Sequence, residues 1–178
     1  MKCIMVLDIN NEPMNGGSFV RVLPRGWTTS IYSIATLALA PMLRGQELHD
    51  HLFNAGGMDQ ARKSLLGQCA KADIAIGFSA GGTVLWQACL AGFSCPDLVC
   101  LSSTRLRYET IRPAARTHVL FDAADPGIPQ APRLRSLADS YSVAGMQGHD
   151  AYCDPSSILS ANGRKIISEI LHGSLPPN

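Results

Sequence analysis

The sequence predicts a three-layer α/β/α fold built on a mostly parallel sheet of about six strands. Short apolar runs alternate with segments of helical periodicity along most of the chain, a pattern typical of βα units with right-handed crossovers. Several runs lack alternating polar residues, as expected for strands that helices cover on both faces. The 178 residues suit a single domain spanning residues 1–178.

Six runs have the apolar, β-branched or aromatic residues that are typical of strands. They are residues 2–7, 27–34, 73–78, 97–101, 117–121 and 140–144. Two of these runs, 73–78 and 117–121, are each followed at once by a loop rich in small or polar residues.

Three segments have the apolar spacing of helices. They are residues 58–70, 81–90 and 157–171. Residues 18–23 indicate a short helix that Pro24 ends, because proline cannot continue a helix. Residues 36–52 predict a helix interrupted by Pro41 and Gly45.

Composition excludes several classes of function. The net charge is +1, and no basic run or stripe occurs, so we expect no nucleic-acid partner. No window approaches the roughly 18–20 apolar residues that a membrane span needs, so no membrane span is expected. The oligomeric state stays open.

The six cysteines form no CxxC pair, and His49 and His51 stand together without a nearby cysteine. This spacing does not suit a metal site, and we expect no metal. Most of the cysteines lie in apolar segments and are predicted to be buried thiols, which points to the reducing cytoplasm. We also expect no cofactor, because neither a GxGxxG motif nor a P-loop lysine motif is present.

The most informative segment is Gly77-Phe78-Ser79-Ala80-Gly81, which lies between a predicted strand and a predicted helix. A GxSxG motif in this context forms a strained turn that exposes a serine hydroxyl, and glycines at its ends let helix and strand approach closely. The amide of Ala80 then points into the same space at a helix N-terminus, where negative charge is favoured. The alternative is a glycine-rich turn that binds a phosphate or nothing.

Two further residues follow in the order that this chemistry requires. Asp125 lies in the loop after the strand at 117–121, and His149 lies in a glycine-rich loop before the last helix. A histidine can take the proton of a serine hydroxyl, and a carboxylate orients the imidazole and stabilises its charged form. Asp122 is the rival acid, but Asp125 is preferred because it lies farther beyond the strand end.

Together the GFSAGG elbow, the DAADPGIP loop and the GHD loop resemble the α/β-hydrolase superfamily, in its small, minimal or dienelactone-hydrolase-like form. The resemblance spans roughly residues 2–171. It implies a minimal α/β-hydrolase fold without a lid domain, and a Ser79, His149 and Asp125 triad. It also implies acyl-enzyme chemistry on a small-molecule acyl substrate, namely a carboxylic ester, thioester or lactone.

The resemblance also suggests where the substrate lies. A second oxyanion donor, beside Ala80, is expected from the loop after the first strand, where Ile9 or Asn10 would supply an amide. The block Asp8-Ile9-Asn10 departs from the His-Gly found in many relatives. Candidate substrate-binding residues are Phe78, Asn10, Met146 and Tyr152, with Trp27 as a further candidate; plain core packing is the alternative for the large apolar side chains.

Three functions are compatible with the sequence. The first is a serine hydrolase of the carboxylic-ester type. The second is a non-catalytic binding module that retains the hydrolase fold, which the unusual residues after the first strand motivate. The third is an acyltransferase that uses the same triad, because hydrolysis and acyl transfer share the acyl-enzyme.

Overall fold

The computed structural model describes residues 1–173 and contains a six-stranded sheet in which all neighbouring strands are parallel. The spatial order is β2-β1-β3-β4-β5-β6. The strands are β1 Lys2–Val6, β2 Thr28–Tyr32, β3 Ile74–Phe78, β4 Asp97–Leu101, β5 Arg116–Phe121 and β6 Ser140–Val143. The predicted fold class is confirmed, with a sheet that is entirely rather than mostly parallel. Residues 174–178 of the predicted domain lie outside the described residues.

The inner strands β1, β3, β4 and β5 are buried on both faces. Their near-continuous apolar sequences follow from this position, since neither face meets water. The edge strands β2 and β6 keep partly exposed side chains. Because all six strands are parallel, their carboxyl ends meet at the same edge of the sheet, and the loops that leave this edge carry Ser79, Asp125 and His149.

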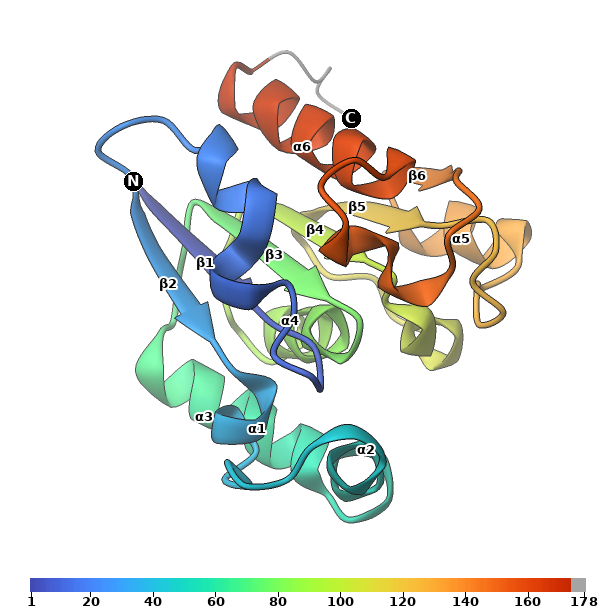
Figure 1. Cartoon of the computed structure of the whole chain (residues 1–178). Helices are drawn as coiled ribbons and strands as arrows, with labels where there is room; N and C mark the ends of the chain where they lie inside the picture. The colour runs from blue at the N-terminus through green and yellow to red at the C-terminus, as the bar shows by residue number, and fades with distance from the viewer. Residues whose placement is uncertain (174–178) are drawn as a thin grey trace.

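Helices cover both faces of the sheet (Figure 1). On one face, apolar side chains of five α-helices and of η2 share a core with the sheet. These elements are α1 Ile34–Leu37, α2 Gly45–Asn54, α3 Gly57–Gln68, α4 Ala80–Leu90, α5 Ala131–Leu137 and the 3₁₀ helix η2 Thr104–Tyr108. The opposite face is covered by α6 Ile158–Leu171 and by the 3₁₀ helices η1 Met14–Val22 and η3 His149–Cys153.

The central helix α4 is buried along most of its length, since it packs on β1, β3 and β4 and is itself covered by α3. Its sequence AGGTVLWQACL contains no charged residue, as expected for a helix that is surrounded by protein. Trp86 is fully buried and donates its indole N–H to the carbonyl of Ile111 at 3.1 Å. This packing fixes the start of α4, and hence Ser79, against the middle of the sheet.

All six predicted strands are confirmed, with bounds that shift by at most two residues. The helix expected at residues 18–23 is part of the longer 3₁₀ segment η1, and the interrupted helix at 36–52 is the separate pair α1 and α2. The sequence reasoning did not predict α5, whose seven residues include a proline near the start. So short a segment carries too little periodicity to be recognised.

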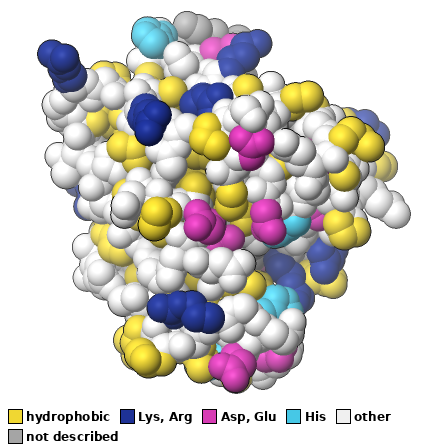
Figure 2. All heavy atoms as spheres, in the orientation of Figure 1, with side chains coloured by type: hydrophobic (Ala, Val, Ile, Leu, Met, Phe, Trp, Pro, Cys, Tyr) yellow, Lys and Arg dark blue, Asp and Glu magenta, His cyan; other side chains and the backbone are white. Residues whose placement is uncertain are grey.

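The surface carries charges of both signs. The face in Figure 2 shows basic and acidic side chains set apart among uncharged ones, without one continuous basic area. In residues 1–173, no helix combines the length and the hydropathy that crossing a membrane would require.

Four of the six cysteines are buried, as predicted for most of them, whereas Cys89 is partly exposed and Cys153 is exposed.

Candidate active site

Ser79 occupies a strained turn between β3 and α4. Its backbone has φ 49° and ψ −116°, a conformation that costs energy for any residue with a Cβ and is often found at functional sites. The Ser79 amide continues the ladder of β3 by donating to the carbonyl of Leu101 at 2.8 Å. The strain is therefore held in place by the sheet on one side and by the buried helix α4 on the other.

The glycines of the elbow are required by close contacts of backbone with backbone. A Cβ on Gly77 would overlap the backbone of Gly82, and a Cβ on Gly81 would overlap the carbonyl oxygen of Val6 in β1. Because backbone atoms cannot turn aside as a flexible side chain can, larger residues would push α4 away from the sheet. The two glycines thus keep the serine at the sheet edge, as the motif predicts.

The structure brings Ser79, His149 and Asp125 into one chain of hydrogen bonds. The Asp125 Oδ2 atom lies 2.6 Å from His149 Nδ1, and His149 Nε2 lies 2.8 Å from Ser79 Oγ. The buried carboxylate of Asp125 accepts the Nδ1 proton, which leaves Nε2 free to accept the hydroxyl proton of Ser79. These three residues come from the loops after β3 and β5 and from the start of η3.

The hydrogen bond to Asp125 raises the pKa of His149 above its ordinary value of 6.5. Burial opposes this shift in part, because it disfavours the charged imidazolium, while the negative charges of Asp150 and Asp8 act in the same direction as Asp125. The imidazole is therefore a stronger base than a free histidine, and at the same time its side chain stays partly exposed to a reactant.

Asp122, the alternative acid, binds backbone amides of two loops. Its fully buried carboxylate accepts the amide of Ala124 at 3.0 Å and the amide of Gly148 at 2.9 Å. Burial alone would raise the pKa of Asp122, but hydrogen bonds from Gly148, Ala124 and Gln147 outweigh it and hold the pKa below its ordinary range. Asp122 thus ties the loop that precedes His149 to the end of β5, and Asp125 contacts the imidazole.

Two residues with unpaired backbone amides line the same pocket as the serine. Ile9, in the loop after β1, and Ala80, at the start of α4, both line the pocket that contains Ser79. Neither amide has a hydrogen-bond partner among residues 1–173. An amide pair of this kind can stabilise an oxyanion, and the Ala80 amide has the added advantage of a helix N-terminus.

A buried pair, Asp8 and Tyr152, joins the loop of Ile9 to the segment of His149. Asp8 accepts the amides of Asn10 at 2.8 Å and Glu12 at 2.7 Å, and the Tyr152 hydroxyl donates to its other oxygen at 2.6 Å. Burial raises the pKa of Asp8, and these three hydrogen bonds counteract that shift only in part. Because Tyr152 lies in the helix η3 that begins at His149, the pair couples two sides of the pocket.

The pocket beside Ser79 has a volume of about 190 Å³. Its lining residues come from five loops or helices at the carboxyl edge of the sheet and are Ile9, His49, Phe53, Ser79, Ala80, Thr104, Arg105 and His149. Sequence reasoning missed His49, Phe53, Thr104 and Arg105. His49 and Phe53 lie one turn apart on α2. This spacing indicates that they share a face of the helix, but it does not indicate that this face lies beside Ser79.

None of the predicted substrate-binding residues is among those that line the pocket beside Ser79. Phe78 and Tyr152 are buried and pack against each other in the core, with ring centroids 5.6 Å apart, because the last residue of β3 points into the layer beneath α6 rather than outward. Met146 is exposed and lines a different hollow. Asn10 is exposed and its amide is held by Asp8. Trp27 packs on the core at the opposite end of β2.

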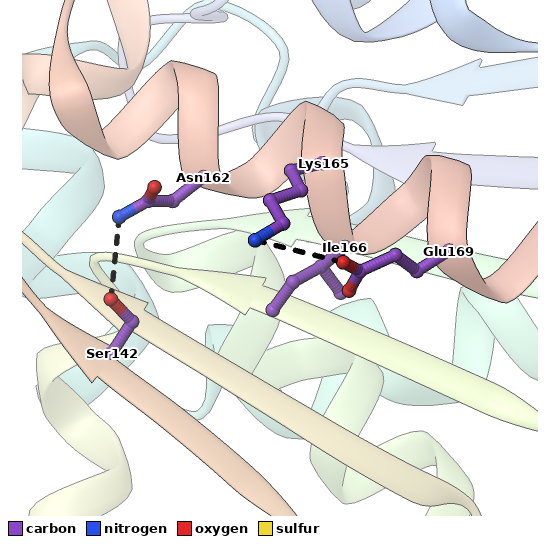
Figure 3. A pocket seen from close by; sticks show the side chains of 5 residues that line it. All are labelled: Ser142, Asn162, Lys165, Ile166 and Glu169. Carbon is purple, nitrogen blue, oxygen red and sulfur yellow. Dashed lines mark hydrogen bonds and ion pairs between the residues drawn. The ribbon is translucent and has the colours of Figure 1, made fainter. Parts of the chain in front are cut away.

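Other candidate groups lie away from this chemistry. His118, within β5, is buried between Asp97 at 3.2 Å and the Ser140 hydroxyl at 2.8 Å, so it is a structural residue. A further hollow lies between β6 and α6, and Figure 3 shows the side chains that line it. Its volume is about 230 Å³. There Lys165 pairs with Glu169 at 3.8 Å, and the charges of this hollow largely neutralise each other.

No family model matches the chain, and no curated protein matches it in sequence. Solved structures do match. A hydrolase of the alpha/beta superfamily from Xanthomonas campestris pv. campestris has a TM-score of 0.64 at 17% identity, over 97% of this chain and 98% of its own. The similarity therefore lies in the fold, at a level of identity where sequence comparison finds nothing.

Two other structures are also similar. One is an extracellular alpha/beta-hydrolase from a Paenibacillus species, which is described as sharing structural and functional homology with tobacco salicylic acid binding protein 2. It has a TM-score of 0.55 at 11% identity, and the match covers 99% of this chain and 100% of that chain. An uncharacterized protein from Bacillus cereus ATCC 10987 has a TM-score of 0.62 at 12% identity over 97% of this chain, which spans 59% of that protein. The chain has the α/β-hydrolase fold.

The Asp8–Tyr152 contact yields a test. Tyr152→Phe removes a hydrogen bond to a buried carboxylate and is expected to cost about 1.5–3 kcal/mol of unfolding free energy, measured by urea denaturation. Tyr141→Phe is the matched control. Among residues 1–173, the partly exposed Tyr141 hydroxyl has one hydrogen bond, to Arg135 at 3.4 Å, so its loss is expected to cost less than about 0.5 kcal/mol. Equal losses in the two variants would show that Asp8 does not depend on Tyr152.

Proposed function

We propose that this protein is a serine hydrolase that cleaves a carboxylic ester, thioester or lactone through an acyl-enzyme on Ser79. The observation that carries the proposal is the continuous hydrogen-bond chain from Asp125 through His149 to the Ser79 hydroxyl. A serine in a core or on a surface needs neither a strained backbone nor a histidine partner, whereas a nucleophilic serine needs both.

The hydrogen-bond chain supports an acylation step on Ser79. His149 Nε2 takes the hydroxyl proton as Ser79 Oγ bonds to the carbonyl carbon, and the carbonyl oxygen becomes an oxyanion that the Ala80 and Ile9 amides can hold. The tetrahedral intermediate then expels the alcohol or thiol, which receives the proton from His149. Asp125 keeps the imidazole in the required tautomer and stabilises the imidazolium while it exists.

Deacylation repeats these steps with water. His149 takes a proton from a water molecule as its oxygen attacks the acyl carbon, and the proton then passes to Ser79 Oγ as the carboxylic acid leaves. The partial exposure of the His149 side chain supports this step, because water can reach the imidazole. The net reaction consumes one ester and one water and yields one acid and one alcohol.

The first test is the loss of the nucleophile. Ser79→Ala is expected to reduce kcat/KM on p-nitrophenyl acetate by at least about 10³-fold, because the acyl-enzyme can no longer form. Ser156→Ala is the matched control, since Ser156 is exposed and, within the described residues, its side chain hydrogen-bonds to Asp154 alone. This variant should retain full activity. Undiminished hydrolysis by Ser79→Ala would refute the proposal.

The second test uses pH. Because His149 acts as a base only when neutral, and because Asp125 raises its pKa, wild-type kcat/KM should fall with decreasing pH through an apparent pKa above 6.5. Asp125→Asn removes the largest cause of this rise while burial remains, so the apparent pKa should decrease, and kcat should fall by about 10³–10⁴-fold.

Asp122→Asn serves as the comparison for this test, because Asp122 binds the loop amides and not the imidazole. It should leave the apparent pKa of the wild type in place even if it lowers stability. An unchanged pH profile in Asp125→Asn, or a larger shift in Asp122→Asn, would contradict the assignment of Asp125.

A further inference from the structure

Arg105 brings a positively charged side chain to the pocket, and the proposed mechanism does not use this charge. It lies on η2, directly after the end of β4, and lines the pocket together with Ser79 and His149. Within residues 1–173, no carboxylate lies at ion-pair distance from its guanidinium. By contrast, Arg112 and Arg116, which lie before and at the start of β5, pair with Asp139 and Asp97.

Among residues 1–173, no oxygen atom accepts a hydrogen bond from the Arg105 guanidinium. Its Nη2 atom donates to His49 Nε2 at 3.1 Å, and its Cζ atom lies 4.0 Å above the ring of Phe53. Since Nε2 accepts, the proton of the neutral His49 ring is on Nδ1, which faces Asp50 Oδ1 at 3.4 Å. A guanidinium has five N–H donors, so most of the donors of Arg105 remain available to a ligand.

This arrangement is a preorganised anion receptor. Stacking on an aromatic ring and one hydrogen bond restrict the side chain before any ligand binds, which reduces the entropy lost on binding. A planar guanidinium matches a carboxylate in two parallel hydrogen bonds. The neighbouring Thr104 hydroxyl, which has no hydrogen-bond partner in the described residues, lines the same pocket and can donate to the same group.

We propose that the physiological substrate is a short acyl ester, thioester or lactone that carries a carboxylate, and that Arg105 binds this carboxylate. The proposal rests on the serine hydrolase function proposed above and adds the class of substrate. A single fixed positive charge suits a monoanion better than a phosphate dianion. The pocket volume of about 190 Å³ equals roughly six water volumes, which is room for a short chain.

The test compares two esters of equal chain length, mono-p-nitrophenyl adipate and p-nitrophenyl hexanoate, with Ser79→Ala as the background for spontaneous hydrolysis. Arg105→Met keeps the length and the apolar contact with Phe53 but removes the charge. It should lower kcat/KM for the adipate ester about 10- to 100-fold, as expected for lost charged hydrogen bonds. The hexanoate ester should change less than about threefold.

Two further variants sharpen the comparison. Arg105→Lys should recover part of the loss, because it restores the charge without the planar fork. Arg135→Met removes the same charge from the exposed face of α5 and should leave the ratio of the two esters unchanged. Equal losses for both esters in Arg105→Met, or no preference for the adipate ester in the wild type, would overturn the proposal.

A binding measurement separates this proposal from the proposed function. Calorimetric titration of the Ser79→Ala chain with adipate should show binding that Arg105→Met weakens at least about tenfold, whether or not the wild type hydrolyses either ester. Absence of adipate binding, or an Arg105-dependent preference for inorganic phosphate over adipate, would overturn the carboxylate assignment. Absence of hydrolysis with intact adipate binding would refute the hydrolase and leave the anion site standing.

Discussion

The site depends on the parallel direction of all six strands, because this direction brings every carboxyl end to one edge of the sheet. Ile9 follows β1, Ser79 follows β3, Arg105 follows β4, Asp125 follows β5 and His149 follows β6. Residues that are up to 140 positions apart in the chain thus meet around one pocket of about 190 Å³. An antiparallel pairing of any of these strands would send its loop to the opposite edge and remove one group from the site.

Buried carboxylates fix the loops of the site through hydrogen bonds. Asp8 holds the loop of Ile9 and binds Tyr152, and Asp122 holds the loop before His149 through Gly148. A buried charge is costly unless hydrogen bonds compensate it. Backbone amides and the Tyr152 hydroxyl bind both oxygens of Asp8, whereas the two amides that bind Asp122 both donate to its Oδ1. Asp125 differs from Asp8 and Asp122 because its Oδ2 contacts the imidazole of His149. This contact raises the pKa of His149.

The strands and the residues Ser79, Asp125 and His149 could be predicted because they depend on local patterns and on the order of residues along the chain. Continuous apolar runs mark buried strands, and the GFSAG elbow requires a strand before it and a helix after it. The lining of the pocket could not be predicted in this way. His49, Phe53 and Arg105 line the pocket of Ser79 because α2 and η2 pack at the edge of the sheet. Phe78 and Tyr152 are large and mainly apolar, and the sequence alone does not distinguish a core position from a pocket position for such residues.

The central claim is that Asp125 and His149 make Ser79 a nucleophile, and covalent labelling with a fluorophosphonate tests it most directly. The predicted result, measured by peptide mass spectrometry, is one adduct on Ser79 with loss of fluoride. The rate of labelling should fall at least about 10³-fold in His149→Ala, because the base is gone. No adduct on Ser79 in the wild type, or equal labelling rates in the wild type and His149→Ala, would contradict the claim.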